Sequence, residues 1–271
     1  MSAKHSASAG TPAQFAAIGL DLGGSSIKYG LVDTSGELVQ STFGQATTPE
    51  GAHPDAVAEV MAQILRDLAE LTGEDLAGLP AGITVPGIVI DGVVHSAANI
   101  DEAWIGLDAA ALLSKTLDRQ VAILNDADAA GMAEVYAGAG ARNGEPILGS
   151  TMLLTLGTGI GSAFFRDGVL FPNIEFGHLE IDGFNAESKA AARVMREENL
   201  SWEQYITRLQ RYLSQVEFLC SPDLIIIGGA ISEDHEKFLP KLDLRAKLVP
   251  AKYHNAAGVL GAAHRAMHLS T

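Results

Sequence analysis

Cysteine is almost absent from this sequence of 271 residues, which contains only Cys220. A single thiol excludes a disulfide within the chain and any zinc site built from several thiolates. A chain with so little cysteine suits a reducing compartment, so we expect a cytoplasmic protein. We expect Cys220 itself to be a small buried side chain rather than a nucleophile.

Long apolar runs are missing as well. No stretch approaches the length of a membrane-spanning helix, which needs about 18 apolar residues, so we expect no membrane association. The first 14 residues, MSAKHSASAGTPAQ, are small and polar and lack the apolar core of a signal peptide. They predict a disordered tail at residues 1–14.

Basic residues are few. Lysine and arginine number 18 against 33 acidic residues, for a formal net charge of −15 at pH 7. This balance repels phosphate backbones and disfavours nucleic-acid binding. If the ligand nevertheless carries many phosphates, the basic residues must be unevenly placed, with some of them gathered around it. Hydrophobic residues make up 47% of the chain, which is enough for a folded core.

Apolar periodicity predicts alternating strands and helices, and therefore an α/β fold. The expected strands are Phe15–Leu22, Ile27–Val32, Glu37–Thr42, Ala81–Val85, Val121–Leu124, Thr151–Leu156, Ser162–Phe165 and Leu224–Ile227. The expected helices are Pro54–Leu71, Leu107–Leu117, Ala127–Ala137, Ala186–Glu198, Trp202–Cys220 and Asn255–His268. A short hairpin is expected at Ile88–His95, with its turn at Asp91-Gly92.

A weak internal repeat accompanies this pattern. A strand, a glycine-rich turn and a second strand occur at Ile18–Val32 and again at Leu153–Val169. Two copies of one phosphate-binding unit, one in each lobe, would make a bilobal kinase with a cleft between its lobes.

The first of the two glycine turns is Asp21–Lys28, DLGGSSIK. Its backbone N–H groups and serine hydroxyls can cradle phosphate oxygens, and Lys28 adds a positive charge. Asp21 is placed to hold Mg²⁺, through water. The stretch lacks the residue order of a P-loop, and an ordinary glycine hairpin is the alternative.

The second glycine turn is Leu156–Gly161, LGTGIG. It superficially matches a dinucleotide fingerprint, but a strand rather than a helix is expected after it. NAD binding is therefore rejected and phosphate binding is kept. A glycine hairpin needed only for packing again remains open.

Asn125-Asp126 follows a strand and begins a helix, where open α/β sheets hold catalytic groups. A carboxylate there can take the proton of a sugar hydroxyl as that hydroxyl attacks a phosphoryl group. Asp126 could instead be a plain helix N-cap. Asp128 is a competing acid, whose simpler role is a charge near the helix N-terminus.

A compact polar set lies at Glu175–His178, with Glu187 further along the chain. Fixed carboxylates and imidazoles can read sugar hydroxyls. The same region could instead be a metal site with Glu175, His178, Glu180 and Asp182 as ligands.

Two further loops carry candidate contacts. The amide of Asn99 has either a turn role or a sugar-contact role. Gly228-Gly229, after a predicted strand, could receive an adenosine or a phosphate tail, and a plain strand-to-helix turn is the alternative.

Taken together, these stretches resemble the sugar kinases of the ROK family, and within it the actinobacterial polyphosphate glucokinases and polyphosphate/ATP glucomannokinases. The resemblance covers essentially everything after the tail. It rests on Ile18–Asp33, Thr84–Gly87, Ser96–Gly106, Leu124–Gly131, Thr155–Phe164, Asn173–Gly183, Leu200–Leu213, Ser221–Gly229 and Phe238–Val249.

The resemblance implies a bilobal actin-like (ribonuclease H-like) sugar kinase fold, with two α/β domains and a cleft between them. Residues 15–124 and a C-terminal helix at 255–271 would form the N-terminal lobe, and residues 125–254 the C-terminal lobe. The implied reaction is Mg²⁺-dependent transfer of the terminal phosphoryl group of inorganic polyphosphate or ATP to the 6-hydroxyl of glucose, and of mannose. Either a monomer or a homodimer is compatible with it.

The alternatives are an ATP-only glucokinase, another phosphotransferase of the same superfamily, and a non-catalytic sugar sensor. Relatives that act as repressors carry an N-terminal helix-turn-helix domain, whereas only about 14 residues precede the first expected strand here. With the net charge of −15, DNA binding is disfavoured.

Carried over residue by residue, the resemblance makes Asp126 the base that activates the sugar 6-hydroxyl. It implies the sugar ligands Asn99, Asn125, Asp126, Glu175, His178 and Glu187. It implies contacts to phosphate or ATP from Asp21, Gly23, Gly24, Ser25, Ser26, Lys28, Thr158, Gly159, Gly161, Gly228 and Gly229, with Asp21 also handling Mg²⁺.

Two points concern metal and donor. Most ROK kinases follow the Gly-His pair with a cysteine-rich zinc motif, but Leu179–Glu187 contains no cysteine, so no zinc site is expected. A polyphosphate donor requires an extended track of basic residues. The alternative is that the basic residues are scattered charges on the surface. The candidates for a track are Lys28, Arg193, Arg196, Arg208, Arg211, Lys241, Arg245, Lys247 and Lys252.

Overall fold

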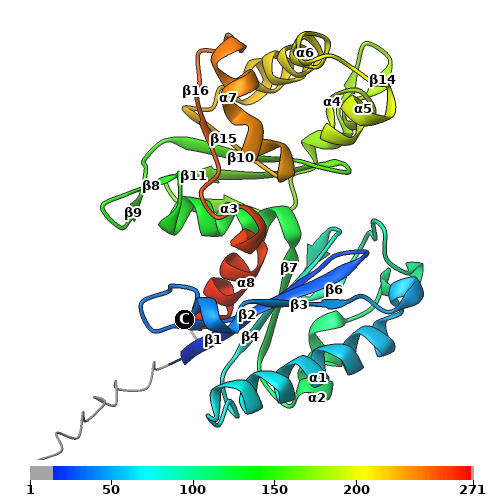
Figure 1. Ribbon diagram of the computed structural model, residues 1–271, viewed down its shortest axis with the longest axis vertical. Helices are drawn as coiled ribbons and strands as arrows, with labels where there is room; N and C mark the ends of the chain where they lie inside the picture. Colours follow the sequence, from blue (N-terminus) through cyan, green and yellow to red (C-terminus); the bar gives the residue numbers. More distant parts are fainter. Residues whose placement is uncertain (1–14, 270–271) are drawn as a thin grey trace, which may run out of the picture.

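Two five-stranded sheets organise the chain, one in each lobe of the computed structural model, which describes residues 15–269 (Figure 1). The strand order is β3-β2-β1-β4-β7 in the first sheet and β12-β11-β10-β15-β16 in the second. In both sheets the first three strands pair antiparallel and the remaining pairs are parallel. The α/β prediction is therefore confirmed, while the predicted tail at 1–14 lies outside the described residues.

The elements have the following bounds. The strands of the two sheets are β1 (Phe15–Leu22), β2 (Ser26–Asp33), β3 (Gly44–Thr47), β4 (Ala81–Val85) and β7 (Val121–Asn125), then β10 (Ser150–Leu156), β11 (Ile160–Arg166), β12 (Val169–Phe171), β15 (Leu224–Gly228) and β16 (Lys247–Pro250). Small hairpins are β5 (Val89–Ile90) with β6 (Val93–Val94), β8 (Ala141–Arg142) with β9 (Glu145–Pro146), and β13 (Glu180–Ile181) with β14 (Phe184–Asn185). The α-helices are α1 (Pro54–Thr72), α2 (Ala109–Leu117), α3 (Asp126–Ala137), α4 (Glu187–Ala190), α5 (Ala192–Glu197), α6 (Trp202–Cys220), α7 (His235–Phe238) and α8 (Ala257–Met267).

The predicted internal repeat appears as two equivalent hairpins. The β1–β2 hairpin turns through its Gly-Gly-Ser segment, and the β10–β11 hairpin turns through Gly-Thr-Gly. Each hairpin holds the same place in its sheet, and in each the first strand also pairs in parallel with the next strand of the sheet. The two glycine turns therefore occupy corresponding positions in the two lobes.

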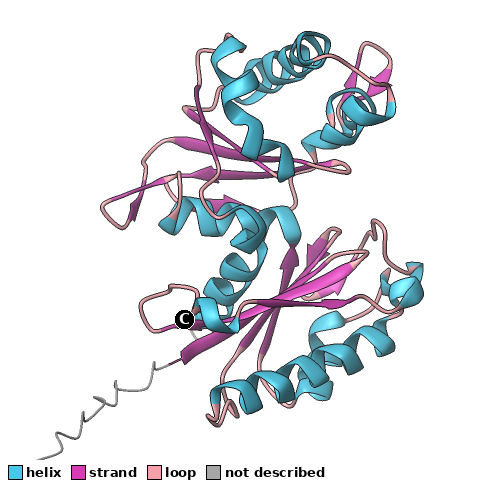
Figure 2. Cartoon of the chain, in the orientation of Figure 1, coloured by secondary structure: helices cyan, strands magenta, loops and turns pink. Residues whose placement is uncertain are grey.

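Helices fill the space between the sheets and cover their outer faces (Figure 2). Helix α3 packs against β10 and β11, α8 packs against β1 and β4, and the two helices pack against each other. Helix α8 lies close to the sheet, since a side chain at Gly82 of β4 would run into the carbonyl oxygen of Ala262. A glycine at position 82 is therefore required for this close approach.

The outer helices bury one apolar stripe each, as their periodicity predicts. Helix α1 buries Val57, Met61, Leu65 and Leu68 against the first sheet. Helix α6 buries Tyr205, Leu209, Tyr212, Leu213 and Val216 against the second. Because α8 packs on the first sheet, we propose the same division as from the sequence, with 15–124 and the described part of 255–271 in one lobe and 125–254 in the other.

The predicted strand at Glu37–Thr42 is wrong. The structure has a 3₁₀ turn at Gln40–Thr42, and the edge strand β3 comes later. The Thr42 hydroxyl accepts a hydrogen bond from the Leu31 amide at 2.9 Å and donates to the Val39 carbonyl at 2.7 Å. These bonds to a buried threonine turn the chain before it can continue as a strand.

The single helix predicted at Ala186–Glu198 is also wrong. The chain forms α4 and α5, separated by Ala191 in an extended conformation. The Arg193 amide at the start of α5 donates to the Gly157 carbonyl at 3.0 Å. The break therefore lets the first turn of α5 bind the second glycine turn, a long-range contact that apolar periodicity does not reveal.

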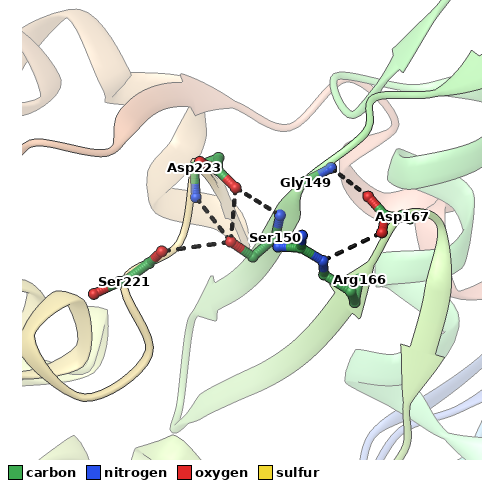
Figure 3. Close-up of polar contacts among 6 residues, drawn as sticks. All are labelled: Gly149, Ser150, Arg166, Asp167, Ser221 and Asp223. Atoms are coloured by element: carbon green, nitrogen blue, oxygen red, sulfur yellow. Dashed lines mark hydrogen bonds and ion pairs between the residues drawn. The ribbon is translucent and has the colours of Figure 1, made fainter.

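A polar cluster holds the end of the second sheet where β10 and β15 begin (Figure 3). The Asp223 carboxylate accepts hydrogen bonds from the amide and the hydroxyl of Ser150, both at 2.8 Å, and these bonds lower the pKa of Asp223. Asp167 accepts from the Gly149 amide at 2.7 Å. The cluster lies at the opposite end of β10 from the glycine turn. Within residues 15–269, no helix is both long enough and apolar enough to cross a membrane.

Candidate active site

Asn125 and Asp126 join β7 to α3, and their roles differ. The Asn125 Oδ1 accepts from the amides of Ala127 at 2.8 Å and Asp128 at 3.0 Å, so Asn125 is the N-cap and the N-cap alternative for Asp126 is wrong. The Asn125 Nδ2 donates to the Gly87 carbonyl at 3.1 Å. The helix occupies the Asn125 Oδ1 and the Gly87 carbonyl occupies one N–H of Nδ2, so a contact to a sugar hydroxyl would use the second Nδ2 proton, and Asn125 as a sugar ligand stays a prediction.

The carboxylate of Asp126 has an unusual electrostatic environment. The residue as a whole is exposed, but the protein atoms around the carboxylate desolvate it and raise its pKa from 3.8 to about 7. The negative charges of Asp21 and Glu175 raise this pKa further. A carboxylate that titrates near neutrality is matched to accepting a proton at physiological pH.

Asp21 is the second-last residue of β1, and Leu22 separates it from the Gly-Gly turn. Its Oδ1 accepts from the Thr84 hydroxyl at 2.7 Å, and its Oδ2 lies 3.4 Å from the Lys28 Nζ. The first turn of α8 packs directly on it, because a side chain at Gly258 would meet the carboxylate. Asp21 lies close enough to Asp126 for its charge to raise the pKa of Asp126.

The first glycine turn presents exposed backbone. Gly24 and Ser25 are exposed, and the Gly23 carbonyl accepts from the Thr48 hydroxyl at 2.6 Å. The exposed Asn99 lies against this turn, since its carbonyl oxygen would be 2.7 Å from a Cβ placed on Gly24. The structure therefore brings the predicted sugar ligand Asn99 next to the predicted donor loop.

The second glycine turn reaches the same region from the other lobe. A Cβ on Gly161 would be 2.9 Å from the Ala127 Cβ, so this turn lies beside the start of α3. Thr158 at its tip is exposed. Gly229 has a φ of 80°, and a side chain there would run into the carbonyl oxygen of Leu156. The predicted nucleotide residues Gly228 and Gly229 thus adjoin the second turn.

Glu187, a predicted sugar ligand, also makes a hydrogen bond within the protein that the sequence did not suggest. Its Oε2 accepts from the Ile160 amide at 3.2 Å, and it would lie 2.6 Å from a Cβ on Gly159. Glu187 therefore supports the second glycine turn with one oxygen. Its charge also raises the pKa of Glu175.

Glu175 precedes a 3₁₀ turn that His178 ends, and the His178 amide donates to the Glu175 carbonyl at 3.1 Å. Burial raises the pKa of the half-buried Glu175, and the charges of His178 and Glu187 act on it in opposite directions. The structure therefore brings together three predicted sugar ligands, Glu175, His178 and Glu187, and places Glu175 within electrostatic reach of Asp126.

The alternative of a metal site around His178 is not supported. Among the described residues, no group of three or more His, Cys, Asp or Glu side chains could hold a metal ion. Asp182 is instead paired with Arg211, with an Oδ1–Nη2 distance of 2.8 Å.

Asn173 is a functional candidate that the sequence reasoning missed. Its side chain accepts from the Val89 amide at 2.9 Å and donates to the Val89 carbonyl at 2.8 Å, which ties the loop before Glu175 to the other lobe. Its own amide donates to the Asp128 Oδ2 at 2.9 Å. No local pattern marks Asn173, because its partners lie far away in the chain.

Asp128 is buried, with 2% of its surface exposed. Its Oδ1 has no hydrogen-bond partner in the part of the chain that the structure describes. Burial raises the pKa of Asp128 to about 6, and the charge of Glu175 adds to this increase. Asp128, the alternative to Asp126 in the sequence analysis, is thus a buried carboxyl.

The candidate basic residues do not share one location. Lys28 and Arg193 adjoin the two glycine turns. The Arg245 charge acts on Asp223, and Lys247 pairs in register with Leu224, so both lie at the opposite end of the second sheet. The nine candidates therefore do not all line a single track, because Arg245 and Lys247 lie away from the glycine turns. Of the others, Arg208 pairs with Glu198 at 2.6 Å, Arg211 pairs with Asp182, and the Lys252 Nζ donates to the Ala137 carbonyl at 3.1 Å.

The chain is similar in sequence to the proteins of a known family. The ROK family model matches residues 17–191. The polyphosphate glucokinase of Mycobacterium leprae is 43% identical over 257 residues, covering 94% of this chain and 76% of that protein. The polyphosphate glucokinase of Mycobacterium tuberculosis (strain H37Rv) is 43% identical over 256 residues, covering 94% of this chain and 92% of that protein.

Solved structures give the same result. The inorganic polyphosphate/ATP-glucomannokinase from Arthrobacter sp. strain KM superposes with a TM-score of 0.85 at 48% identity, covering 94% of this chain and 99% of that one. A ROK family glucokinase from Streptomyces griseus in complex with glucose and AMPPNP has a TM-score of 0.74 at 21% identity, covering 92% and 98% of the two chains, and shows the fold alone.

Proposed function

Because the chain belongs to the ROK family, we propose that it is a hexokinase-type phosphotransferase of the polyphosphate glucokinase kind. It transfers the terminal phosphoryl group of inorganic polyphosphate or ATP to the 6-hydroxyl of glucose, and also of mannose. The relatives named for polyphosphate, ATP, glucose and mannose support this choice of substrates.

One observation carries the proposal on the structural side. Asp126 lies where the second glycine turn meets α3, within electrostatic reach of Asp21 on the donor side and of Glu175 on the acceptor side. A base between a phosphate-binding turn and a sugar-binding set is the arrangement that phosphoryl transfer to a hydroxyl requires. In this proposal Asp126 receives the 6-hydroxyl proton, and Glu175, His178, Glu187 and Asn99 hold the sugar.

The residues present fit a Mg²⁺ ion that arrives with the donor. Two carboxylates, Asp21 and Asp126, lie close enough for one to raise the pKa of the other, and a divalent cation relieves this repulsion. Mg²⁺ keeps much of its water shell, so one carboxylate together with phosphate oxygens is sufficient. When bound, the ion neutralises charge on the transferred phosphoryl group.

The donor phosphates would bind at the two glycine turns. Gly24, Ser25, Thr158 and Gly159 offer backbone N–H groups or hydroxyls at these turns, and Lys28 offers a positive charge. Of the nine candidates, Lys28 and Arg193 are the two that contacts among the described residues place at the turns, so the polyphosphate assignment depends on the relatives rather than on a basic track. We expect a cytoplasmic enzyme.

The test is a donor–acceptor matrix with Mg²⁺, in which ATP and polyphosphate are each offered with glucose and mannose. The Asp126→Asn variant should lose turnover by about 100-fold or more, with glucose binding retained in a calorimetric titration. The matched control is Asp243→Asn, which changes an exposed carboxylate and should keep wild-type turnover.

Three outcomes would contradict parts of the proposal. Near-normal turnover in Asp126→Asn removes Asp126 from the base role. Activity with ATP alone reduces the enzyme to an ATP-dependent glucokinase. Glucose binding without phosphorylation by either donor leaves a non-catalytic sugar sensor.

A further inference from the structure

Asn185 of β14 connects two of the proposed sugar ligands. Its Oδ1 accepts a hydrogen bond from the Glu187 amide at 3.1 Å, and its Nδ2 lies 3.0 Å from the His178 Nδ1. The β13–β14 hairpin carries Asn185 to this point, since Ala186 bonds back to Leu179 through its amide at 2.8 Å. One side chain thus contacts both His178 and the start of α4.

The direction of each bond follows from elementary donor chemistry. The Glu187 backbone amide can only donate, so the Asn185 oxygen must face it. The Asn185 NH₂ group then faces His178, and it can only donate. The His178 Nδ1 must therefore accept, which means that it carries no proton and that the ring proton lies on Nε2.

We infer that Asn185 is a positioning residue, which holds His178 as a neutral ring with its proton on Nε2. His178 can then donate one hydrogen bond, from Nε2, to a hydroxyl oxygen of the sugar. Among the described residues, no protein atom accepts this Nε2–H. The inference rests on the proposed sugar site for its purpose, but not for the protonation pattern itself.

The neighbouring charges leave the assignment in place. His178 acts electrostatically on Glu175, whose carboxylate makes no hydrogen bond to Nδ1. Asn185 is exposed, so its contact with His178 adds little to the folding core. The contact instead determines the orientation and the tautomer of the His178 ring.

Nuclear magnetic resonance tests the tautomer without any activity assay. The protein is labelled with ¹⁵N-histidine, and the His178 ring is assigned with a His178→Gln variant. Near pH 8 a two-bond ¹H–¹⁵N correlation should show His178 neutral, with Nε2 protonated and Nδ1 bare. A wild-type ring protonated on Nδ1 would overturn the inference.

The Asn185→Asp variant separates positioning from structure. A carboxylate can still accept from the Glu187 amide, but it must also accept from His178, so the ring should gain a proton on Nδ1. The matched control Ser188→Ala removes a hydroxyl that donates to the Asn185 carbonyl at 2.6 Å, in the same segment but without contact to His178. The control should keep the wild-type tautomer.

Kinetics complete the test. In Asn185→Asp and Asn185→Ala, the KM for glucose should rise about threefold to tenfold, the effect of one hydrogen bond, with a smaller change in the KM for the phosphoryl donor. An unchanged tautomer together with an unchanged glucose KM in both variants refutes the positioning role. A wild-type protein that phosphorylates no hexose refutes the proposed function instead, while the tautomer result stands on its own.

Discussion

Asp128 is the side chain whose replacement gives the sharpest stability prediction. It is 2% exposed, one of its oxygens has no partner among the described residues, and its pKa is raised from 3.8 to about 6. A carboxyl whose pKa rises by that much on folding opposes folding at neutral pH by about 3 kcal/mol. The variant Asp128→Asn should therefore make the protein more stable, not less.

The amide suits the site for a second reason. Its oxygen can still accept from the Asn173 amide, which lies 2.9 Å from the Asp128 Oδ2. The amide is itself a buried polar group, so about 3 kcal/mol is an upper limit and a gain of about 1–3 kcal/mol is expected near pH 7.5.

The sign of the pH dependence is opposite to that of a paired surface carboxylate. Folded Asp128 binds its proton more tightly than unfolded Asp128, so stability is highest when the folded carboxyl is protonated and falls as pH rises from about 4 to about 6. The advantage of Asp128→Asn over wild type should accordingly shrink by about 1 kcal/mol or more between pH 7.5 and pH 5.

Urea unfolding at these two pH values measures the effect. Asp243→Asn, which changes an exposed carboxylate, is the control and should follow wild type at both. A destabilised Asp128→Asn at neutral pH, or a gain of equal size at both pH values, would refute the reasoning, because then the buried charge is not what opposes folding.

Two further predictions follow from the site. The value of kcat/KM for glucose should fall at acid pH with an apparent pKa of about 7, because Asp126 must be ionised to accept a proton. In Asp21→Asn this apparent pKa should be lower, because a negative charge near Asp126 is removed. An unchanged apparent pKa in that variant would contradict the electrostatic coupling of Asp21 to Asp126. The variant Asn173→Gly can keep the backbone φ of 60° but loses both side-chain hydrogen bonds to Val89. Its free energy of unfolding in urea should be lower by about 1–3 kcal/mol, and its KM for glucose should be higher. If neither value changes, the hydrogen bonds between Asn173 and Val89 contribute neither to stability nor to glucose binding.

Local signals in the sequence were sufficient for most elements. Phe15–Leu22, Ala81–Val85 and Trp202–Cys220 have the predicted bounds, because an apolar run or stripe ended by a polar residue or a turn defines them locally. The two failures, at Glu37–Thr42 and Ala186–Glu198, occur where a tertiary hydrogen bond overrides periodicity. The pattern of apolar side chains predicts which residues are buried, but it does not predict tertiary hydrogen bonds.

The candidate site divides in the same way. The glycine turns and Asp126 could be singled out because glycine pairs and strand-end acids have a chemistry that is visible in the sequence. Asn173 and Asn185 could not, because an asparagine in a loop has no fixed role until its partner is known. Their partners, Val89 and His178, become neighbours only through the folded chain.

The sequence by itself therefore determined the α/β class, the repeated strand–turn–strand unit and the set of chemical groups available, since these follow from local composition and spacing. Tertiary structure alone decided which of those groups meet. It made Asn125 a cap and left Asp126 exposed between Asp21 and Glu175. It also dispersed the basic residues that the sequence could only count. The physical reason is that hydrogen bonding and Coulomb interaction depend on distance in space, which is set when two sheets pack against α3 and α8.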